Sequence, residues 1–257
     1  MKKNSILHLP AALQQARRRL KQINNQRDGF HLNSKYWQDW KSKLPALSSE
    51  IQEIAIGMLL SDACMYKKSK HPLIKFEQGY LQKEFLYNLF SIFKPNCFML
   101  EPGQRITLKG NRKGLIKSYW FKTFSHSYFD YLWDLFYRPL PSLSSVSCGR
   151  KEERKKIANG LILNHLTERG LAYWIMGDGS LSKDRKTMIL HTQGYSQSEN
   201  LILSRELNEK FGFRTEVISH KKIYFVIKFN SKDALTLHNA IKPFVIESMK
   251  YKLPISE

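Results

Sequence analysis

The chain holds two short runs of almost uninterrupted apolar residues, and each run ends in an aspartate. The first covers residues 54–63 (IAIGMLLSDA) and contains Asp62; the second covers residues 170–179 (GLAYWIMGDG) and contains Asp178. A helix that is apolar on all sides is a buried one. A carboxylate at its C-terminus is unfavourable beside the negative end of the helix dipole unless a cation offsets both charges. The pattern therefore predicts two buried helices that share a cation site.

The two runs belong to a longer internal repeat. Asp178 follows Asp62 by 116 positions (178 − 62), and residues 78–84 (QGYLQKE) match residues 193–199 (QGYSQSE) at five of seven positions. Farther along, residues 119–124 correspond to residues 224–229, and the spacing shrinks only where loops can shorten. Such an internal repeat predicts two copies of one unit and an approximate two-fold axis inside a single chain.

Hydrophobic periodicity predicts the same order of elements in both halves. In the first half, Ser49 and Gln52 form a capping-box pattern before a helix that ends near Asp62. We expect the elements after it to be a hairpin, a helix, two strands and a helix, over residues 65–78, 81–93, 105–109, 117–124 and 126–137. In the second half, Thr167 is the expected N-cap of a helix that runs to Asp178. The elements after it are expected over residues 179–193, 199–211, 214–219, 222–229 and 232–241. Each half therefore reads αββαββα, which places the chain in the α+β class.

Composition divides the chain into four parts. We expect a basic N-terminal extension over residues 1–46, a first repeat over 47–140, a Pro/Ser-rich linker over 141–155 and a second repeat over 156–257. The first 45 residues carry ten Lys+Arg and two Asp (10 − 2 = +8), with Arg17-Arg18-Arg19 on an expected helix. This extension is expected either to contact a phosphate backbone or to serve as a transit peptide.

The charge of the whole chain indicates an acidic polymer as partner. It contains 42 Lys+Arg against 22 Asp+Glu, a formal net charge of +20, and its pI is about 9.8. That is the range expected of a nucleic-acid-binding protein. No apolar run approaches the roughly 20 residues that span a bilayer, so we expect no membrane association. The three cysteines, Cys64, Cys97 and Cys148, are widely spaced and indicate a reducing compartment without disulfides or zinc.

These motifs resemble a known family. The two runs ending in aspartate, the Leu166-Thr167 pair before residues 171–174, and residues 251–254 (YKLP) are similar to the LAGLIDADG homing endonucleases, in their single-chain, two-repeat, intron-encoded branch. The resemblance covers nearly everything from Leu47 to the C-terminus. It implies two pseudo-symmetric αββαββα repeats, with the motif helices packed at the pseudo-dyad. Each repeat would place a four-stranded antiparallel saddle in the major groove of DNA.

The residues of the motif helices fit close packing. Gly57 and Ser61 lie four positions apart, on one helix face, which permits a close approach between the two helices. The equivalent positions of the second run are Tyr173 and Gly177. Because Tyr173 is bulky, we expect less symmetric packing there.

The resemblance also implies the active-site residues. Asp62 and Asp178, with the backbone carbonyls of Ser61 and Gly177, are expected to bind two or more Mg²⁺ ions, for which Mn²⁺ can substitute. The other expected catalytic residues are two glutamines that orient water, Gln78 and Gln193, and two lysines that stabilise the developing charge on the phosphate, Lys156 and Lys252. Lys155 is the alternative to Lys156.

We expect the basic residues of the strands and hairpins to bind DNA. Those of the first repeat are Lys67, Lys68, Lys70, Lys75, Arg105, Lys109, Arg112, Lys117 and Lys122. Those of the second repeat are Lys183, Arg185, Lys186, Lys221, Lys222 and Lys228. The sequence does not separate contacts with bases from contacts with phosphates.

The function implied is a monomeric, site-specific homing endonuclease of an organelle. It would make a double-strand break in a long DNA target by metal-dependent hydrolysis and so support intron mobility. One alternative on the same scaffold is an RNA-binding splicing factor, or maturase, whose partner is the protein's own intron RNA; another is a DNA-binding regulator without catalytic activity. Cleavage of a duplex in the presence of Mg²⁺ separates the first function from the other two.

Overall fold

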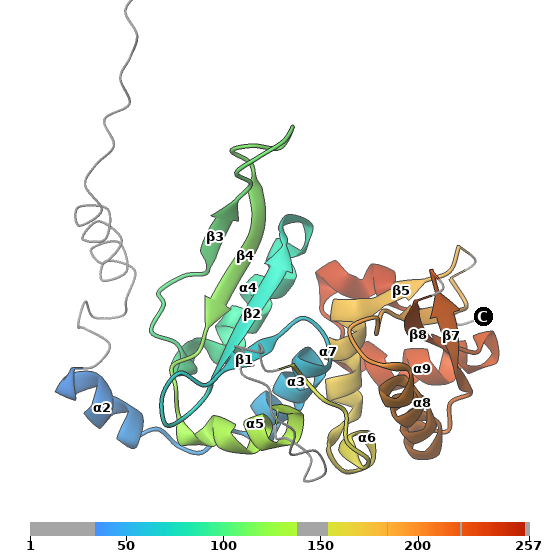
Figure 1. Ribbon diagram of the computed structural model, residues 1–257, viewed down its shortest axis with the longest axis horizontal. Helices are drawn as coiled ribbons and strands as arrows, with labels where there is room; N and C mark the ends of the chain where they lie inside the picture. The colour runs from blue at the N-terminus through green and yellow to red at the C-terminus, as the bar shows by residue number, and fades with distance from the viewer. Residues whose placement is uncertain (1–33, 138–153, 184, 222, 255–257) are drawn as a thin grey trace, which may run out of the picture.

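The two repeats lie side by side in the structure, a computed structural model that describes residues 34–137, 154–183, 185–221 and 223–254 (Figure 1). The first repeat consists of α3 (Ser49–Leu60), β1 (Cys64–Tyr66), β2 (Leu73–Gly79), α4 (Lys83–Phe93), β3 (Gly103–Ile106), β4 (Ile116–Lys122) and α5 (Asp130–Tyr137). The second consists of α7 (Glu168–Asp178), β5 (Gly179–Leu181), β6 (Met188–Leu190), α8 (Gln197–Phe211), β7 (Thr215–His220), β8 (Tyr224–Phe229) and α9 (Ala234–Ile241). The order αββαββα is therefore confirmed in both halves.

Several short 3₁₀ helices connect these elements. In the described part of the chain they are η2 (Tyr80–Gln82), η3 (Lys94–Asn96), η4 (Ser127–Phe129), η5 (Ser231–Asp233), η6 (Lys242–Phe244) and η7 (Glu247–Lys252). A short α-helix that the periodicity did not predict, α6 (Leu161–His165), precedes α7. In the described residues, no helix combines the length and the apolar character needed to cross a membrane.

Each repeat carries one antiparallel sheet. The strand order is β1-β2-β4-β3 in the first sheet and β5-β6-β8-β7 in the second. Alternate residues of a strand point to opposite faces, and in β2 Ile74 and Phe76 are buried whereas Lys75 and Glu77 on the other face are only partly so. The sheets lie on either side of the α3–α7 pair, and the β3–β4 hairpin reaches beyond the rest of the first repeat (Figure 1).

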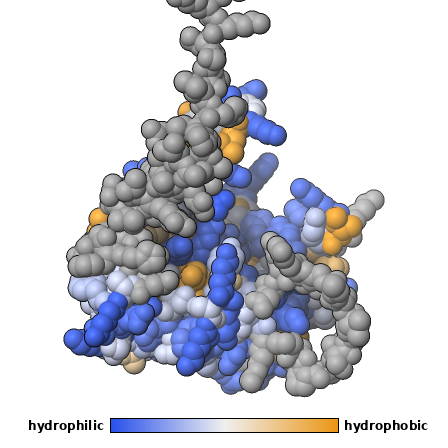
Figure 2. All heavy atoms as spheres, turned by 60° about the vertical axis from the view of Figure 1, so that its left-hand side comes forward, coloured by the Kyte–Doolittle hydropathy of each residue, from blue (hydrophilic) through white to orange (hydrophobic). Residues whose placement is uncertain are grey.

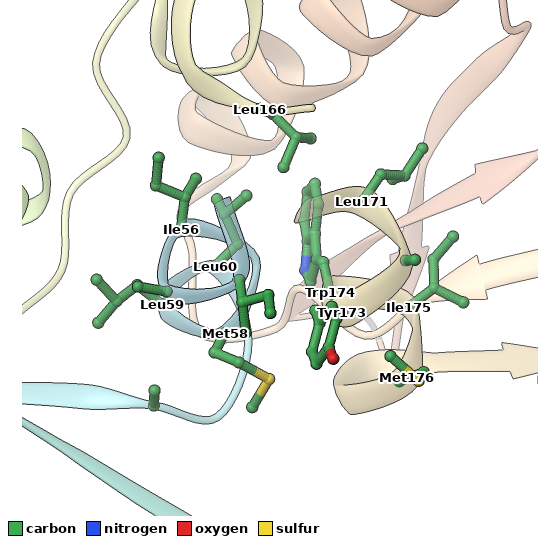
Figure 3. Packing of buried hydrophobic residues seen from close by; sticks show 14 of the residues in the cluster. Ile56, Met58, Leu59, Leu60, Leu166, Leu171, Tyr173, Trp174, Ile175 and Met176 are labelled. Atoms are coloured by element: carbon green, nitrogen blue, oxygen red, sulfur yellow. The ribbon is translucent and has the colours of Figure 1, made fainter. Parts of the chain in front are cut away.

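The paired helices α3 and α7 form the centre of the molecule. A Cβ atom added at Gly57 would lie 2.1 Å from the carbonyl oxygen of Gly170, so only glycine fits at this crossing. Ile56 and Leu59 point away from α7 into the first repeat, and Leu171 and Ile175 point away from α3 into the second (Figure 3). Residues 54–60 of α3 and 170–176 of α7 are buried on every side, because each face of these segments meets protein.

The helix starts agree with the sequence in one repeat and differ by one residue in the other. Thr167 Oγ1 accepts a hydrogen bond from the Gly170 amide and caps α7, as predicted. The N-cap of α3 is Ser48 rather than the predicted Ser49: its Oγ accepts from the Ile51 amide at 3.3 Å. Two adjacent serines carry the same capping signal, so the pattern alone does not choose between them.

The described end of the N-terminal extension is part of the folded first repeat. Helix α2 (Lys35–Ser42) buries Trp37 completely, with its ring 4.6 Å from that of Phe98. Trp40 lies edge-on to Phe124 at 5.6 Å. The Arg17-Arg18-Arg19 cluster, and all but the last two residues of the predicted linker, lie outside the described residues.

Candidate active site

The ends of α3 and α7 bring the two aspartates together. Asp178 is the last residue of α7; α3 ends at Leu60, and Asp62 follows the C-cap residue Ser61. A Cβ atom added at Gly177 would lie 2.0 Å from Ser61 Oγ and 3.7 Å from Asp62 Oδ2. The carboxylate of the first repeat therefore lies beside the residue that precedes Asp178 in the second.

Burial and the nearby carboxylate of Asp62 both change the protonation of Asp178. Burial, reinforced by the negative charge of Asp62, raises the pKa of Asp178 to about 7. Lys155 and Lys252 act in the opposite direction, but their positive charges do not outweigh burial. A further cation beside Asp178 would therefore favour its ionised form.

A lysine ammonium caps the C-terminal end of each motif helix. Lys155 Nζ donates to the carbonyl oxygens of Leu59, Ser61 and Ala63 at 2.7, 2.6 and 3.1 Å. Lys252, which is only 7% exposed, donates to those of Ile175, Met176 and Gly177 at 3.5, 2.5 and 3.0 Å. Burial lowers the pKa of Lys252 to about 8, although Asp178 and Asp62 counteract this.

The structure corrects the choice of lysine in the first repeat. Lys155, the predicted alternative, occupies the position that matches Lys252. The side chain of Lys156 is exposed, and its backbone amide donates to the carbonyl oxygen of Phe136. Two neighbouring lysines cannot be told apart by composition, because only the direction of the backbone decides which of them enters the site.

The two glutamines take different positions. Gln78 is buried at the end of β2, and its Nε2 donates to Asp62 Oδ2 at 3.0 Å. Gln193 lies beyond the end of β6, and its Nε2 lies 3.2 Å from His191 Nδ1. In the described structure, therefore, Gln78 contacts an aspartate of the pair and Gln193 contacts a histidine.

The donor set fits a hard divalent cation. Two carboxylates and the carbonyl oxygens of Ser61 and Gly177 belong to the adjacent ends of α3 and α7. Mg²⁺ prefers oxygen ligands of this kind. Each carbonyl oxygen has a second lone pair beside the one that accepts from lysine. The described residues contain no cluster of three or more His, Cys, Asp or Glu side chains that would form a complete metal site. A cation would therefore need further ligands from water or phosphate.

The first sheet has a basic outer face, the face turned away from its core. Lys75 and Lys122 are cross-strand partners on this face, and Arg105 lies on it beside Ser118. Glu77 forms ion pairs with Lys75 and with Arg105, the latter at 3.0 Å, and this pairing holds both cations in place. Hydrophilic residues predominate over the described surface in Figure 2, and hydrophobic residues form small separate patches.

The other predicted DNA-binding residues of the first repeat lie in loops or at an irregularity. Lys67, Lys68 and Lys70 are exposed in the loop between β1 and β2. In the β3–β4 loop, the guanidinium of Arg112 lies 4.2 Å from the ring centroid of Tyr80, and Lys109 is exposed. Lys117 has no cross-strand partner in β3, because a bulge shifts the pairing from Arg105–Ser118 to Ile106–Ile116.

The second repeat presents fewer basic side chains on its strands. Lys228 lies on the outer face of β8, paired with Glu216 at 3.4 Å, and Lys183 and Lys221 are exposed in hairpin turns. Arg185 differs from the prediction: it is half-buried, and its Nη2 donates to the Leu253 carbonyl oxygen at 3.1 Å. Lys186 is half-buried next to it, and Lys222 lies outside the described residues.

Sequence reasoning missed one residue that contacts the site. Tyr195 belongs to the repeated Gln-Gly-Tyr segment, and its hydroxyl donates to the Leu60 carbonyl oxygen at 2.9 Å. The repeat itself was the available signal, but it does not show that the tyrosine reaches across to the other repeat.

Two αββαββα repeats with paired aspartates at the ends of their central helices define a two-repeat endonuclease scaffold. The sequence model of the LAGLIDADG DNA endonuclease family matches residues 52–237, and the chain belongs to this family. This finding confirms the predicted family and fold.

Individual relatives agree with the assignment. The chain is 31% identical over 242 residues to the probable intron-encoded endonuclease 1 of Wickerhamomyces canadensis, a match that covers 91% of this chain and 97% of that protein. It is 51% identical over 141 residues to the probable intron-encoded DNA endonuclease 3 of Mycosarcoma maydis, covering 55% of this chain and 96% of that protein. The homing endonuclease I-WcaI bound to its DNA recognition sequence has a similar structure, with a TM-score of 0.77, 30% identity, and coverage of 90% of this chain and 97% of that one.

Proposed function

We propose that this protein is a homing endonuclease that cuts both strands of a long DNA site. The observation that carries this proposal is the convergence of Asp62 and Asp178 between two sheets, the first of which has a basic outer face. The relatives named as intron-encoded endonucleases, and the DNA-bound structure of I-WcaI, support it.

Divalent cations belong to this proposal. Asp62, Asp178 and the carbonyl oxygens of Ser61 and Gly177 would hold Mg²⁺, with Mn²⁺ as a substitute, and such ions supply Lewis-acid catalysis and lower the pKa of bound water. The carboxylate of Asp178 would then be held in the ionised form, because a cation offsets the burial and the neighbouring negative charge of Asp62 that raise its pKa.

The chain's own groups position the reaction. Lys155 and Lys252 present ammonium charge beside the two carboxylates, where it stabilises negative charge that develops on a scissile phosphate. Gln78 is anchored to Asp62 and orients water on the first side. Gln193 has the matching role on the second side, with His191 as its anchor. Each repeat thereby cuts one strand, and the two cuts are offset, leaving short 3′ overhangs.

The DNA would lie across both sheets. The basic outer face of the first sheet and the exposed lysines of the hairpin turns neutralise phosphates of the DNA backbone. A single chain supplies both repeats, so the active form is a monomer. An organellar, intron-encoded gene and a role in intron mobility complete the proposal, supported by the names of the relatives.

Selection from a randomised duplex library tests this function. The purified full chain is incubated with the library in Mg²⁺ or in EDTA, and the cut ends are captured and sequenced. We expect a single family of long sites, cut on both strands only in Mg²⁺. A protein that cuts no duplex under any divalent ion, or that cuts equally in EDTA, would contradict the proposal.

A further inference from the structure

The C-terminal ends of the two motif helices are capped by different sets of donors. At α7, the carbonyl oxygens of Ile175, Met176 and Gly177 all accept from Lys252. The residues of α3 that match them are Leu59, Leu60 and Ser61, at a spacing of 116. Of these three residues, Lys155 donates hydrogen bonds only to the carbonyl oxygens of Leu59 and Ser61.

The carbonyl oxygen of Leu60 accepts a hydrogen bond from Tyr195 instead. The tyrosine hydroxyl donates to it at 2.9 Å, and the tyrosine side chain is 8% exposed. The third bond of Lys155 goes to the Ala63 carbonyl oxygen at 3.1 Å. The ammonium of Lys155 therefore bonds on both sides of Asp62, whereas the three carbonyls that Lys252 caps all precede Asp178.

The tyrosine of the corresponding tripeptide in the first repeat makes different contacts. Gln78-Gly79-Tyr80 corresponds to Gln193-Gly194-Tyr195, but β2 continues through Gln78 to Gly79, whereas β6 already ends at Leu190. Tyr80 is 40% exposed and stacks on the guanidinium of Arg112. Among the described contacts, no bond from Tyr80 to α7 matches the bond from Tyr195 to α3.

We propose that Tyr195 is a positioning residue that reaches across from the second repeat and sets the positions of Lys155 and Asp62 in the first active site. The two active sites are consequently unequal, and the site at Asp62 depends on a residue of the other repeat. Without the hydroxyl, the Leu60 carbonyl oxygen has no donor, and Lys155 moves toward it, as Lys252 does toward Met176, and away from Ala63. This inference rests on the proposed endonuclease activity.

Strand-specific cutting tests the inference. The wild type, Tyr195→Phe and the matched control Tyr80→Phe are assayed in single turnover, with Mg²⁺, on a selected duplex that carries a different label on each strand. A fourth variant, Gln78→Ala, identifies the strand that the Asp62 site cuts, because Gln78 binds Asp62. The ratio of the two strand rates is measured within each folded molecule, so a lower folded fraction does not change it.

We expect Tyr195→Phe to slow the strand marked by Gln78→Ala about three- to tenfold relative to the other strand, the effect of losing one hydrogen bond. Tyr80→Phe should leave the ratio as in the wild type. An unchanged ratio in Tyr195→Phe, whether both rates stay the same or fall together, would overturn the inference and leave the endonuclease assignment intact. A slower cut on the other strand would overturn it as well. A wild type that cuts neither strand would instead overturn the proposed function, and the inference with it.

Discussion

Gly57 of α3 packs directly on the backbone of Gly170 in α7, with space for hydrogen atoms only. Gly170 is tightly held as well, because a Cβ atom added there would lie 3.0 Å from the Glu53 carbonyl oxygen. The relation explains how the second motif helix tolerates Tyr173 at the position equivalent to Gly57. Tyr173 turns toward Phe85, with ring centroids 6.1 Å apart, and the close crossing uses Gly170 instead.

Gly57→Ala should therefore destabilise the whole molecule. The added methyl group clashes with backbone, which cannot rotate away, so we expect a loss of about 1–3 kcal/mol or more in the free energy of unfolding. Urea denaturation measures it. Gly79→Ala is the matched control, because nothing lies within 4 Å of a Cβ atom at Gly79 and its φ of −57° suits any residue. Equal stability of the two variants would contradict the close crossing.

The stability of the metal-free protein should depend on pH through Asp178. Its pKa is about 7 in the folded protein against an ordinary value of 3.8, so the folded state binds the proton more tightly than the unfolded state. The contribution of Asp178 to the free energy of unfolding is then greatest below about pH 4 and decreases as the pH rises to about 7. Urea denaturation at pH 5 and pH 8 should show this decrease in the wild type. Asp178→Asn should show a smaller decrease, and added Ca²⁺ should restore stability at pH 8.

DNA affinity should depend on the basic outer face of the first sheet. Lys122→Ala removes an exposed cation beside Lys75, so we expect weaker binding and a salt dependence reduced by about one phosphate contact. Fluorescence anisotropy with Ca²⁺ at several salt concentrations measures both.

Arg185→Ala is the control for this experiment, since the guanidinium of Arg185 binds the Leu253 carbonyl oxygen. It should leave the salt slope of binding unchanged and lower stability instead. A smaller salt slope for Arg185→Ala than for Lys122→Ala would show that the hairpin of the second repeat, rather than the first sheet, binds the phosphate backbone of the DNA.

Helix α2 should contribute to folding of the first repeat. Trp37 is fully buried against Phe98, so Trp37→Ala should cost about 3–5 kcal/mol in the free energy of unfolding. Tyr36→Ala, on the 41% exposed neighbour in the same helix, should cost much less. Thermal denaturation compares the two, and similar losses would mean that α2 is not anchored through Trp37.

The sequence predicts the architecture well because the signals of the motif helices are strong. Burial on all sides produces an uninterrupted apolar run, and duplication repeats that run with its aspartate in the same place. The Thr167 cap and the order αββαββα follow from local rules of the same kind.

The sequence is less informative where side-chain direction decides. Whether Lys155 or Lys156 enters the site depends on the path of a short stretch of backbone, and the structure places Lys155 at the end of α3. The identical segments around Gln78 and Gln193 diverge because β6 ends earlier than β2. The contact of Tyr195 with Leu60 joins residues 135 positions apart, and no local pattern encodes it.

The most direct measurement of the central claim compares double-strand cutting by the wild type, Asp62→Asn and Asp178→Asn on the selected site, with binding measured in Ca²⁺. If the two carboxylates act together, each substitution lowers cutting at least about 100-fold and leaves affinity within a few-fold of wild type. Full cutting by either variant would show that the paired aspartates do not carry out the chemistry.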